Sequence, residues 1–125
     1  MKTNPAVWFE IYVQDIARAR KFYESVLEVK LEKLNTPDLQ MLAFPGSMEV
    51  SQPGIAGALV KMDGFASGGN STLVYFGCAD CAAETGRVAS SGGSVFREKM
   101  SIGEYGFCSL AIDTEGNMFG LHSMK

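Results

Sequence analysis

Residues 8–23 read WFEIYVQDIARARKFY and predict a strand that turns directly into a helix. The first six residues alternate between an apolar face and a face with a carboxylate between two aromatic rings, which is the two-residue period of a strand. The apolar face holds Phe9, Ile11 and Val13; the other face holds Trp8, Glu10 and Tyr12. The strand therefore presents a mixed aromatic and acidic surface opposite its core side.

The spacing of apolar residues changes after Asp15. They then recur every three or four positions, as on one side of a helix. This stripe consists of Ile16, Ala19, Phe22, Tyr23, Val26 and Leu27. Asp15 suits the N-cap position, because its carboxylate can accept hydrogen bonds from unpaired backbone N–H groups in the first turn. A strand, a tight turn and a helix are thus expected within twenty residues.

The composition is that of an ordinary globular domain. The chain has 125 residues, 46% of them apolar, and a net charge of −3, which argues against a nucleic-acid surface because such surfaces are usually basic. No apolar run approaches the ~20 residues of a membrane span, and the first residues lack a secretion signal. Three cysteines are an odd number, which fits a reducing compartment. We therefore expect a cytoplasmic protein that neither binds nucleic acid nor enters a membrane.

The rest of the chain repeats the same order of elements. After the first helix we expect three strands, a loop at 52–57 and a glycine-rich linker at 62–71. A second helix, capped by Asp80 and stopped by Gly92, follows another strand and precedes three more. The expected strands after the first are 29–34, 39–44, 57–61, 72–78, 94–100, 107–113 and 118–123. Two β-α-β-β-β modules, 1–65 and 66–125, are predicted to share one core, because each has too few elements to fold alone.

Three stretches resemble the vicinal oxygen chelate superfamily, which includes glyoxalase I, extradiol dioxygenases and the fosfomycin- and bleomycin-resistance proteins. They are VQDIARARKFYESVL at 13–27, GIAGALV at 54–60 and DTEGNMFGLH at 113–122. The resemblance implies an α+β fold with a single domain over 1–125. Its two βαβββ modules would form a curled mixed sheet around one cavity, as in glyoxalase. It also implies that two chains pair as a homodimer.

Members of that superfamily usually hold a divalent metal in the cavity. Counting from the motifs, the resemblance places the ligand positions at Trp8, Val74 and Gly120, and none of these side chains can ligate a metal. The chain has a single histidine, so a site of two histidines and one carboxylate is impossible within it. We therefore predict no metal site and no cofactor.

The same frame predicts which side chains face the cavity. They come from the first, fifth, seventh and eighth strands, while Tyr75 is expected to point toward the helix. The predicted cavity residues are Trp8, Glu10, Tyr12, Thr72, Val74, Phe76, Cys108, Leu110, Met118, Gly120 and His122. Apolar walls with few polar groups are typical of small-molecule sites. The expected partner is therefore a small apolar or aromatic molecule.

Glu10 and His122 are the two titratable groups of this predicted cavity. Each lies two residues beyond one of the lost ligand positions, and we hypothesise that the two side chains meet, directly or through one water. A carboxylate beside an imidazole orients the ring and favours its charged form, which suits general acid–base catalysis. Two alternatives remain: a structural contact between a buried acid and the imidazole, or a solvent-exposed His122.

The three cysteines allow a weaker hypothesis. Cys78 and Cys81 form a CxxC pair at a strand-to-helix junction, where redox motifs occur, and Cys108 with His122 would complete a zinc set. No second CxxC pair follows. We therefore interpret the cysteines as small apolar residues that fill space.

These observations favour a protein that binds a small apolar or aromatic molecule. One form of this hypothesis is a metal-independent lyase or isomerase, with Glu10 as general base and His122 as its partner. A second is a ligand-sequestering protein of the bleomycin-resistance type. A third is a dioxygenase-related or regulatory protein without catalysis, because a fold alone does not determine function.

Overall fold

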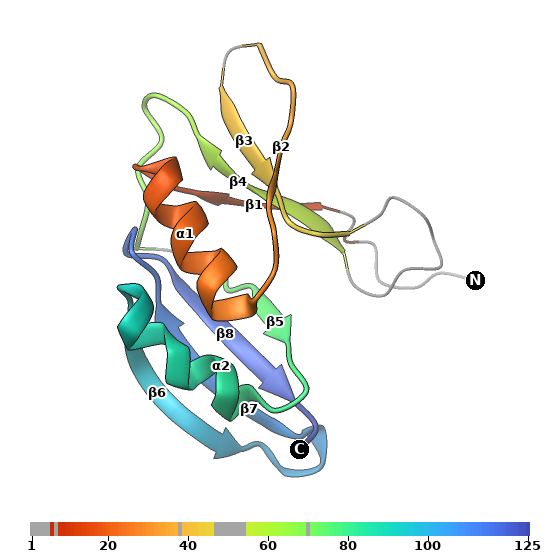
Figure 1. Ribbon diagram of the computed structural model, residues 1–125. Helices are drawn as coiled ribbons and strands as arrows, with labels where there is room; N and C mark the ends of the chain where they lie inside the picture. The colour runs from red at the N-terminus through yellow and green to blue at the C-terminus, as the bar shows by residue number, and fades with distance from the viewer. Residues whose placement is uncertain (1–5, 7, 38, 47–54, 70) are drawn as a thin grey trace, which may run out of the picture.

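The computed structural model describes residues 6, 8–37, 39–46, 55–69 and 71–125, and these form two four-stranded sheets with a helix beside each (Figure 1). The first half supplies β1 (Trp8–Tyr12), α1 (Ile16–Leu27), β2 (Glu32–Lys33), β3 (Gln40–Ala43) and β4 (Ala56–Lys61). The second half supplies β5 (Tyr75–Gly77), α2 (Cys81–Val88), β6 (Ser94–Ser101), β7 (Phe107–Ile112) and β8 (Met118–Ser123). The predicted α+β class and the two βαβββ modules are confirmed.

The two sheets have the same topology. Their strand orders are β1-β4-β3-β2 and β5-β8-β7-β6, and in each sheet the first strand pairs in parallel with the last. Backbone hydrogen bonds repeat as well: Val13 donates to Val60 O (2.9 Å), and Cys78, 65 residues later, donates to His122 O (2.7 Å). The duplicated module inferred from the order of elements is therefore present in the backbone, as two separate mixed sheets.

The boundaries differ from the sequence predictions mainly at short strands. β5 has three residues instead of the seven expected, and β2 has two. β4 begins at Ala56, inside the predicted loop, of which residues 52–54 lie outside the described part of the chain. The predicted linker contains no strand at 62–69 or at Ser71, and Asn70 lies outside the described residues.

Both predicted helix caps are present. The Asp15 carboxylate accepts from the backbone N–H of Arg18 (3.0 Å), and the Asp80 carboxylate accepts from that of Ala82 (3.0 Å). At its other end α2 continues into a short 3₁₀ turn that stops at Gly92, where φ is 104° and favours glycine. Each turn from strand to helix is therefore fixed by an aspartate three residues after the end of the strand.

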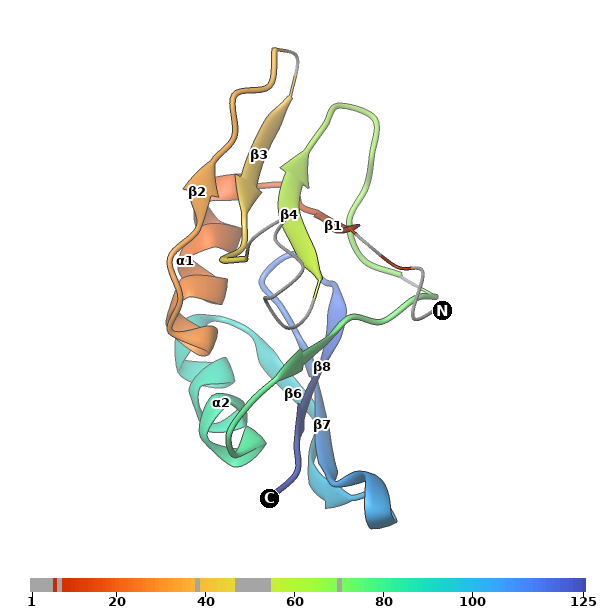
Figure 2. The same cartoon turned by 90° about the vertical axis from the view of Figure 1, so that its right-hand side faces the viewer.

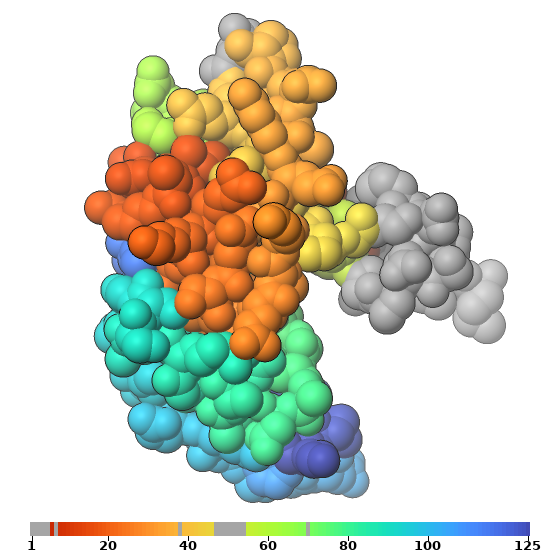
Figure 3. All heavy atoms as spheres, viewed as in Figure 1, coloured from red at the N-terminus to blue at the C-terminus, as the bar shows by residue number. Residues whose placement is uncertain are grey.

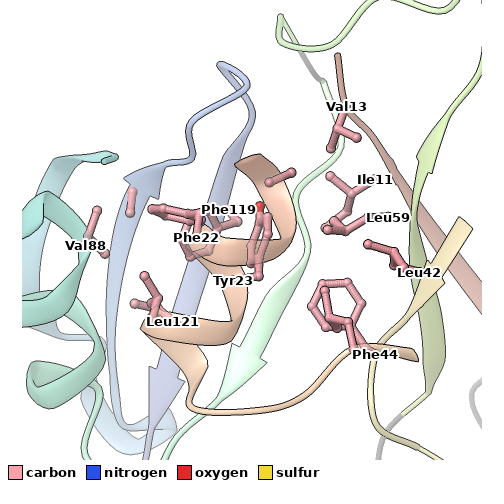
Figure 4. Packing of buried hydrophobic residues seen from close by; sticks show 14 of the residues in the cluster. Ile11, Val13, Phe22, Tyr23, Leu42, Phe44, Leu59, Val88, Phe119 and Leu121 are labelled. Carbon is pink, nitrogen blue, oxygen red and sulfur yellow. The ribbon is translucent and has the colours of Figure 1, made fainter. Parts of the chain in front are cut away.

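The core joins the two modules through α1. Tyr23 and Phe22 are almost fully buried, and Figure 4 shows them with Phe119 and Leu121 of β8 on one side and the first-sheet residues on the other. The Tyr23 ring contacts Phe119 at 5.4 Å and Phe44 at 5.6 Å between centroids. Buried aromatic side chains contribute both apolar area and ring contacts, so this cluster fixes how the two sheets sit against each other.

The helices lie on one side of the sheets. In Figure 2 α1 stands above α2, and both lie to the left of β1, β4, β7 and β8, while Figure 3 shows the atoms of the two helices forming one continuous surface. No helix of the described residues covers the opposite faces. None of the helices in this part of the chain is long and apolar enough to cross a membrane.

Candidate functional site

A hollow of about 450 Å³ lies between the sheets. Its rear is formed by the core residues Tyr23 and Phe119, and its sides come from β1, from the chain after β4 and from the start of β8. The remaining walls are mostly apolar, with Val74 and Met118 among them. The hollow therefore has the apolar lining and the size of a small-molecule site.

One side of the hollow is the outer face of β1, formed by Trp8, Glu10 and Tyr12 and called here the β1 face. The indole N–H of Trp8 donates to one carboxylate oxygen of Glu10 (3.1 Å), and the Tyr12 hydroxyl donates to the other (2.7 Å). The hydrogen bond to Glu10, with burial and the carboxylate charge, raises the pKa of Tyr12. Strand alternation places all three side chains on one face, so the carboxylate is held between two aromatic rings.

The loop after β4 forms a second side. Phe65 stacks on Tyr12 with ring centroids 5.1 Å apart and an interplanar angle of 23°. The Gln14 side-chain amide donates to the Phe65 carbonyl (3.0 Å), and the backbone N–H of Gly68 donates to the Asn117 side chain (2.6 Å). These contacts hold the loop against β1 and β8.

The final turn, residues 113–117, holds together the elements that line the hollow. The Asn117 amide donates to the Tyr12 carbonyl (2.9 Å), which ties β8 to β1. Glu115 accepts from the backbone N–H groups of Gln14 and Asp15 and from the Arg18 guanidinium, all at 2.7–3.0 Å. Burial alone would raise the pKa of Glu115, but these hydrogen bonds outweigh it and lower that pKa to about 2.

Asp113 is the other buried carboxylate of the final turn. It accepts from the Tyr23 hydroxyl (2.6 Å) and from the backbone N–H groups of Glu115 and Asn117. Burial raises the pKa of Asp113, and it also raises that of Tyr23. The turn thus fixes α1, β1 and β8 relative to one another.

Comparisons with known proteins agree on this architecture. Residues 6–31 match the family model described as bleomycin resistance protein-like N-terminal. A search of the curated proteins finds no significant match. Glyoxalase I from Zea mays is 22% identical with a TM-score of 0.74, over 94% of this chain and 43% of its own. The chain has a glyoxalase-like fold.

Two further solved structures match nearly end to end. TnmS3, an antibiotic binding protein from a Streptomyces species, is 20% identical with a TM-score of 0.69, over 100% of this chain and 99% of its own. A glyoxalase/bleomycin resistance protein from Albidiferax ferrireducens is 16% identical with a TM-score of 0.69, over 94% and 98%. The resemblance to glyoxalase and bleomycin-resistance proteins is thus confirmed at the level of the fold, while the chain spans less than half of the maize enzyme.

The residues at the superfamily's metal positions do not fit a metal. The Trp8 indole nitrogen is a donor toward Glu10, Val74 offers no donor atom from its side chain, and Gly120 lies beneath the Tyr75 ring. The described residues contain no group of three or more His, Cys, Asp or Glu side chains placed to hold a metal ion. The absence of a cofactor stays a prediction.

The predicted cavity residues fall into two groups. Trp8, Glu10, Tyr12, Thr72, Val74 and Met118 all line the hollow. Cys108, Leu110, Gly120 and His122 share the outer face of the second sheet, because the register pairs Cys108 with His122 and Leu110 with Gly120. Phe76 belongs to neither group. Apart from Phe76, the sequence frame therefore placed these residues on the correct sheet face but extended the hollow too far along it.

Two predictions of side-chain direction, those for Phe76 and Tyr75, are wrong. Phe76, expected to face the cavity, packs in the core with ring centroids 5.4 Å from Phe44 and 5.9 Å from Phe119. Tyr75, expected beneath the helix, lies on the outer face of its sheet and is 51% exposed. The reason is the register of β5: Tyr75 pairs with Gly120, whose missing side chain leaves room for the ring.

Glu10 and His122 have different partners. The Glu10 carboxylate accepts from its two strand neighbours, whereas the His122 ring nitrogen contacts the Tyr105 carbonyl at 2.7 Å. His122 is also four residues beyond Met118, or ~13 Å along an extended strand, and does not line the hollow. The structure does not bring the two together, and their catalytic roles stay predictions.

Two of the three cysteines, Cys78 and Cys81, behave as packing residues. Cys81 is buried in the core, and Cys78 packs against it. Burial, with the nearby Glu84 charge, raises the pKa of Cys78 to about 12, so its thiol stays protonated near neutral pH. A reactive thiolate is therefore not expected at Cys78.

Sequence reasoning missed Phe65 and the anchoring role of Glu115. Phe65 lies in the glycine-rich linker, where nothing in the periodicity distinguishes a side chain that stacks from one that faces solvent. The partners of Glu115 lie about 100 residues earlier in the chain. An acidic residue in a tight turn carries no local signal of such a distant contact.

Proposed function

We propose that this protein binds a small apolar or aromatic molecule in the hollow and sequesters it without chemical change. The observation that carries the proposal is the hollow itself, about 450 Å³ with mostly apolar walls and a few fixed polar groups. The full-length similarity to an antibiotic binding protein supports a binding role. The ligand would lie against Val74 and Met118, with the β1 face at its polar end.

A metal-independent lyase or isomerase is the second candidate, because Glu10 brings an ionisable group to the hollow. Among the described lining residues, however, there is no histidine, lysine, cysteine or second carboxylate. Proton transfer there would depend on Glu10 and on tyrosine hydroxyls. This arrangement favours binding over catalysis. It also disfavours dioxygenase-related chemistry.

A ligand screen tests the binding proposal. We expect small aromatic compounds to raise the melting temperature, since a ligand at one hundred times its Kd stabilises the folded state by about 2.7 kcal/mol. Titration calorimetry on each hit would then compare the wild type with Ala66→Phe, in which a ring added at the exposed loop residue Ala66 fills the hollow. We expect at least a tenfold loss of affinity.

The matched control is Ala83→Phe, which adds the same ring on the exposed surface of α2. It should leave affinity unchanged. The binding proposal fails if no compound stabilises the wild type, or if hits bind Ala66→Phe as tightly as the wild type.

We also propose that the protein forms a homodimer through its uncovered sheet faces. The second sheet exposes Tyr75, Phe96 and Met100 at 51%, 58% and 38%. Large exposed apolar side chains gathered on one sheet face are typical of protein interaction surfaces. A second copy of the chain would cover this face.

A further inference from the structure

Among the described residues, the hollow contains one formal charge and no cation that neutralises it. Among the described residues that line it, Glu10 is the only one with a charged side chain. None of the ion pairs formed by the described residues includes Glu10. Glu10 is solvent-exposed at the edge of this hollow, and a carboxylate in that position attracts a cation that enters the hollow, with a strength that salt screening reduces.

The charge is held in a fixed position. Each oxygen of Glu10 accepts from one neutral donor, the Trp8 indole at 3.1 Å and the Tyr12 hydroxyl at 2.7 Å. These donors keep the carboxylate between the two rings without cancelling its charge. Each carboxylate oxygen has a second lone pair, so a cationic N–H can still bind.

Aromatic rings surround this charge. Trp8 and Tyr12 flank it along the strand, and Phe65 stacks on Tyr12 from the loop after β4. The faces of tryptophan, tyrosine and phenylalanine attract cations, and the attraction grows as water is excluded. A single carboxylate is too few oxygens for a metal ion such as Ca²⁺, which takes six to eight oxygen ligands.

We propose that the β1 face with Phe65 recognises an organic cation: an ammonium or guanidinium group attached to an apolar or aromatic body. This inference rests on the proposed function, which provides the apolar wall, and names the class of ligand. The cationic group lies beside Glu10, and the body of the molecule packs against Val74 and Met118. Charge and apolar surface are thus recognised within the same hollow.

Trp8 makes the site directly measurable, because it is the only tryptophan of the chain. Its indole N–H gives a single NMR signal, and its fluorescence is the only tryptophan emission. We would titrate the full chain with benzylamine, which is charged at pH 7, and with benzyl alcohol, which has nearly the same shape and no charge. We expect benzylamine to bind at least tenfold more tightly at low salt, with a shift of the indole signal.

The charge of Glu10 should cause that preference. In Glu10→Gln we expect the two probes to bind equally, whereas Glu98→Gln, which removes an exposed carboxylate on β6, should keep the wild-type preference. Raising the salt concentration should reduce the difference in affinity between benzylamine and benzyl alcohol for the wild type. This measurement needs no variant. Circular dichroism would establish that Glu10→Gln is folded.

The outcomes separate this inference from the proposed function. Equal binding of the two probes to the wild type, or a preference that survives in folded Glu10→Gln, overturns the cation site and leaves the binding hollow intact. If neither probe shifts the Trp8 signal and the compound screen also gives no hit, the proposed function fails as well. A preference lost in Glu10→Gln and kept in Glu98→Gln supports the inference.

Discussion

At the scale of single residues, two glycines determine where aromatic rings lie on the sheets. A Cβ at Gly57 would lie 2.3 Å from the Phe9 ring, and one at Gly120 would lie 2.3 Å from the Tyr75 ring. Each ring sits on its cross-strand glycine, an arrangement that covers backbone left bare by the missing side chain. The first pair faces the core, and the second faces outward.

Gly120→Ala should therefore destabilise the protein by about 1 kcal/mol, because the new methyl group displaces a half-exposed ring. In a Tyr75→Ala background the same change should be neutral or stabilising, since alanine is favoured over glycine within a strand once there is space. Urea denaturation of the wild type, the two single variants and the double variant gives the four free energies of this double-mutant cycle. Equal costs in both backgrounds would show that the ring does not constrain Gly120.

The side-chain directions in β1 and β5 show which features of the site could be predicted from the sequence. Alternation correctly predicted the β1 face, because six residues of clean period two leave one choice of direction. β5 is only three residues long and was assigned by counting from the superfamily's ligand position. The repeat offset of 65 would instead have matched Tyr75 with Glu10 and Phe76 with Ile11, as the structure has them.

At the scale of elements, the final turn connects what the sequence keeps apart. Glu115 joins β8 to the residues that start α1, and its side chain is fully shielded while its partner Arg18 is half exposed. The caps and strand order were predictable because their signals are local or repeated. This connection was not, because it depends on tertiary packing.

Glu115→Gln should lower the free energy of unfolding by about 2 kcal/mol at pH 7, since it weakens charge-assisted hydrogen bonds to Arg18 and to two backbone N–H groups. The effect should depend on pH. The folded-state pKa of about 2 lies below the ordinary value of 4.5, so the ionised form is favoured by folding. This stabilisation is complete above about pH 4.5 and is lost as the pH falls toward 2.

Urea denaturation of the wild type and Glu115→Gln at pH 7 and pH 3 measures this. The difference between the two proteins should shrink at the lower pH. Using the difference removes the contribution of Asp113, whose raised pKa acts in the opposite direction. A gap that stays constant over this range would contradict the assigned role of the Glu115 charge.

At the scale of the whole molecule, both modules place their helices on one side and leave the other sheet faces open (Figure 2). The core unites the modules through α1, so each half depends on the other for burial of its apolar surface. The duplicated architecture was predictable from the order of elements. The extent of the hollow was not predictable, because it depends on the angle between the two sheets. That angle cannot be inferred from the sequence of any single strand.

The open face leads to a prediction of oligomeric state. If a second copy covers it, light scattering should give twice the chain mass of 13.5 kDa. Leu110→Glu places a charge at the centre of the outer face of the second sheet, between Gly120 and Arg97 on the neighbouring strands, and should yield a monomer. Its control is Lys21→Glu. Lys21 lies on the exposed surface of α1, on the helix side of the molecule, so this variant should remain a dimer. A wild type that elutes as a monomer across micromolar concentrations would exclude this interface, whereas a folded Leu110→Glu that remains dimeric would place the contact elsewhere.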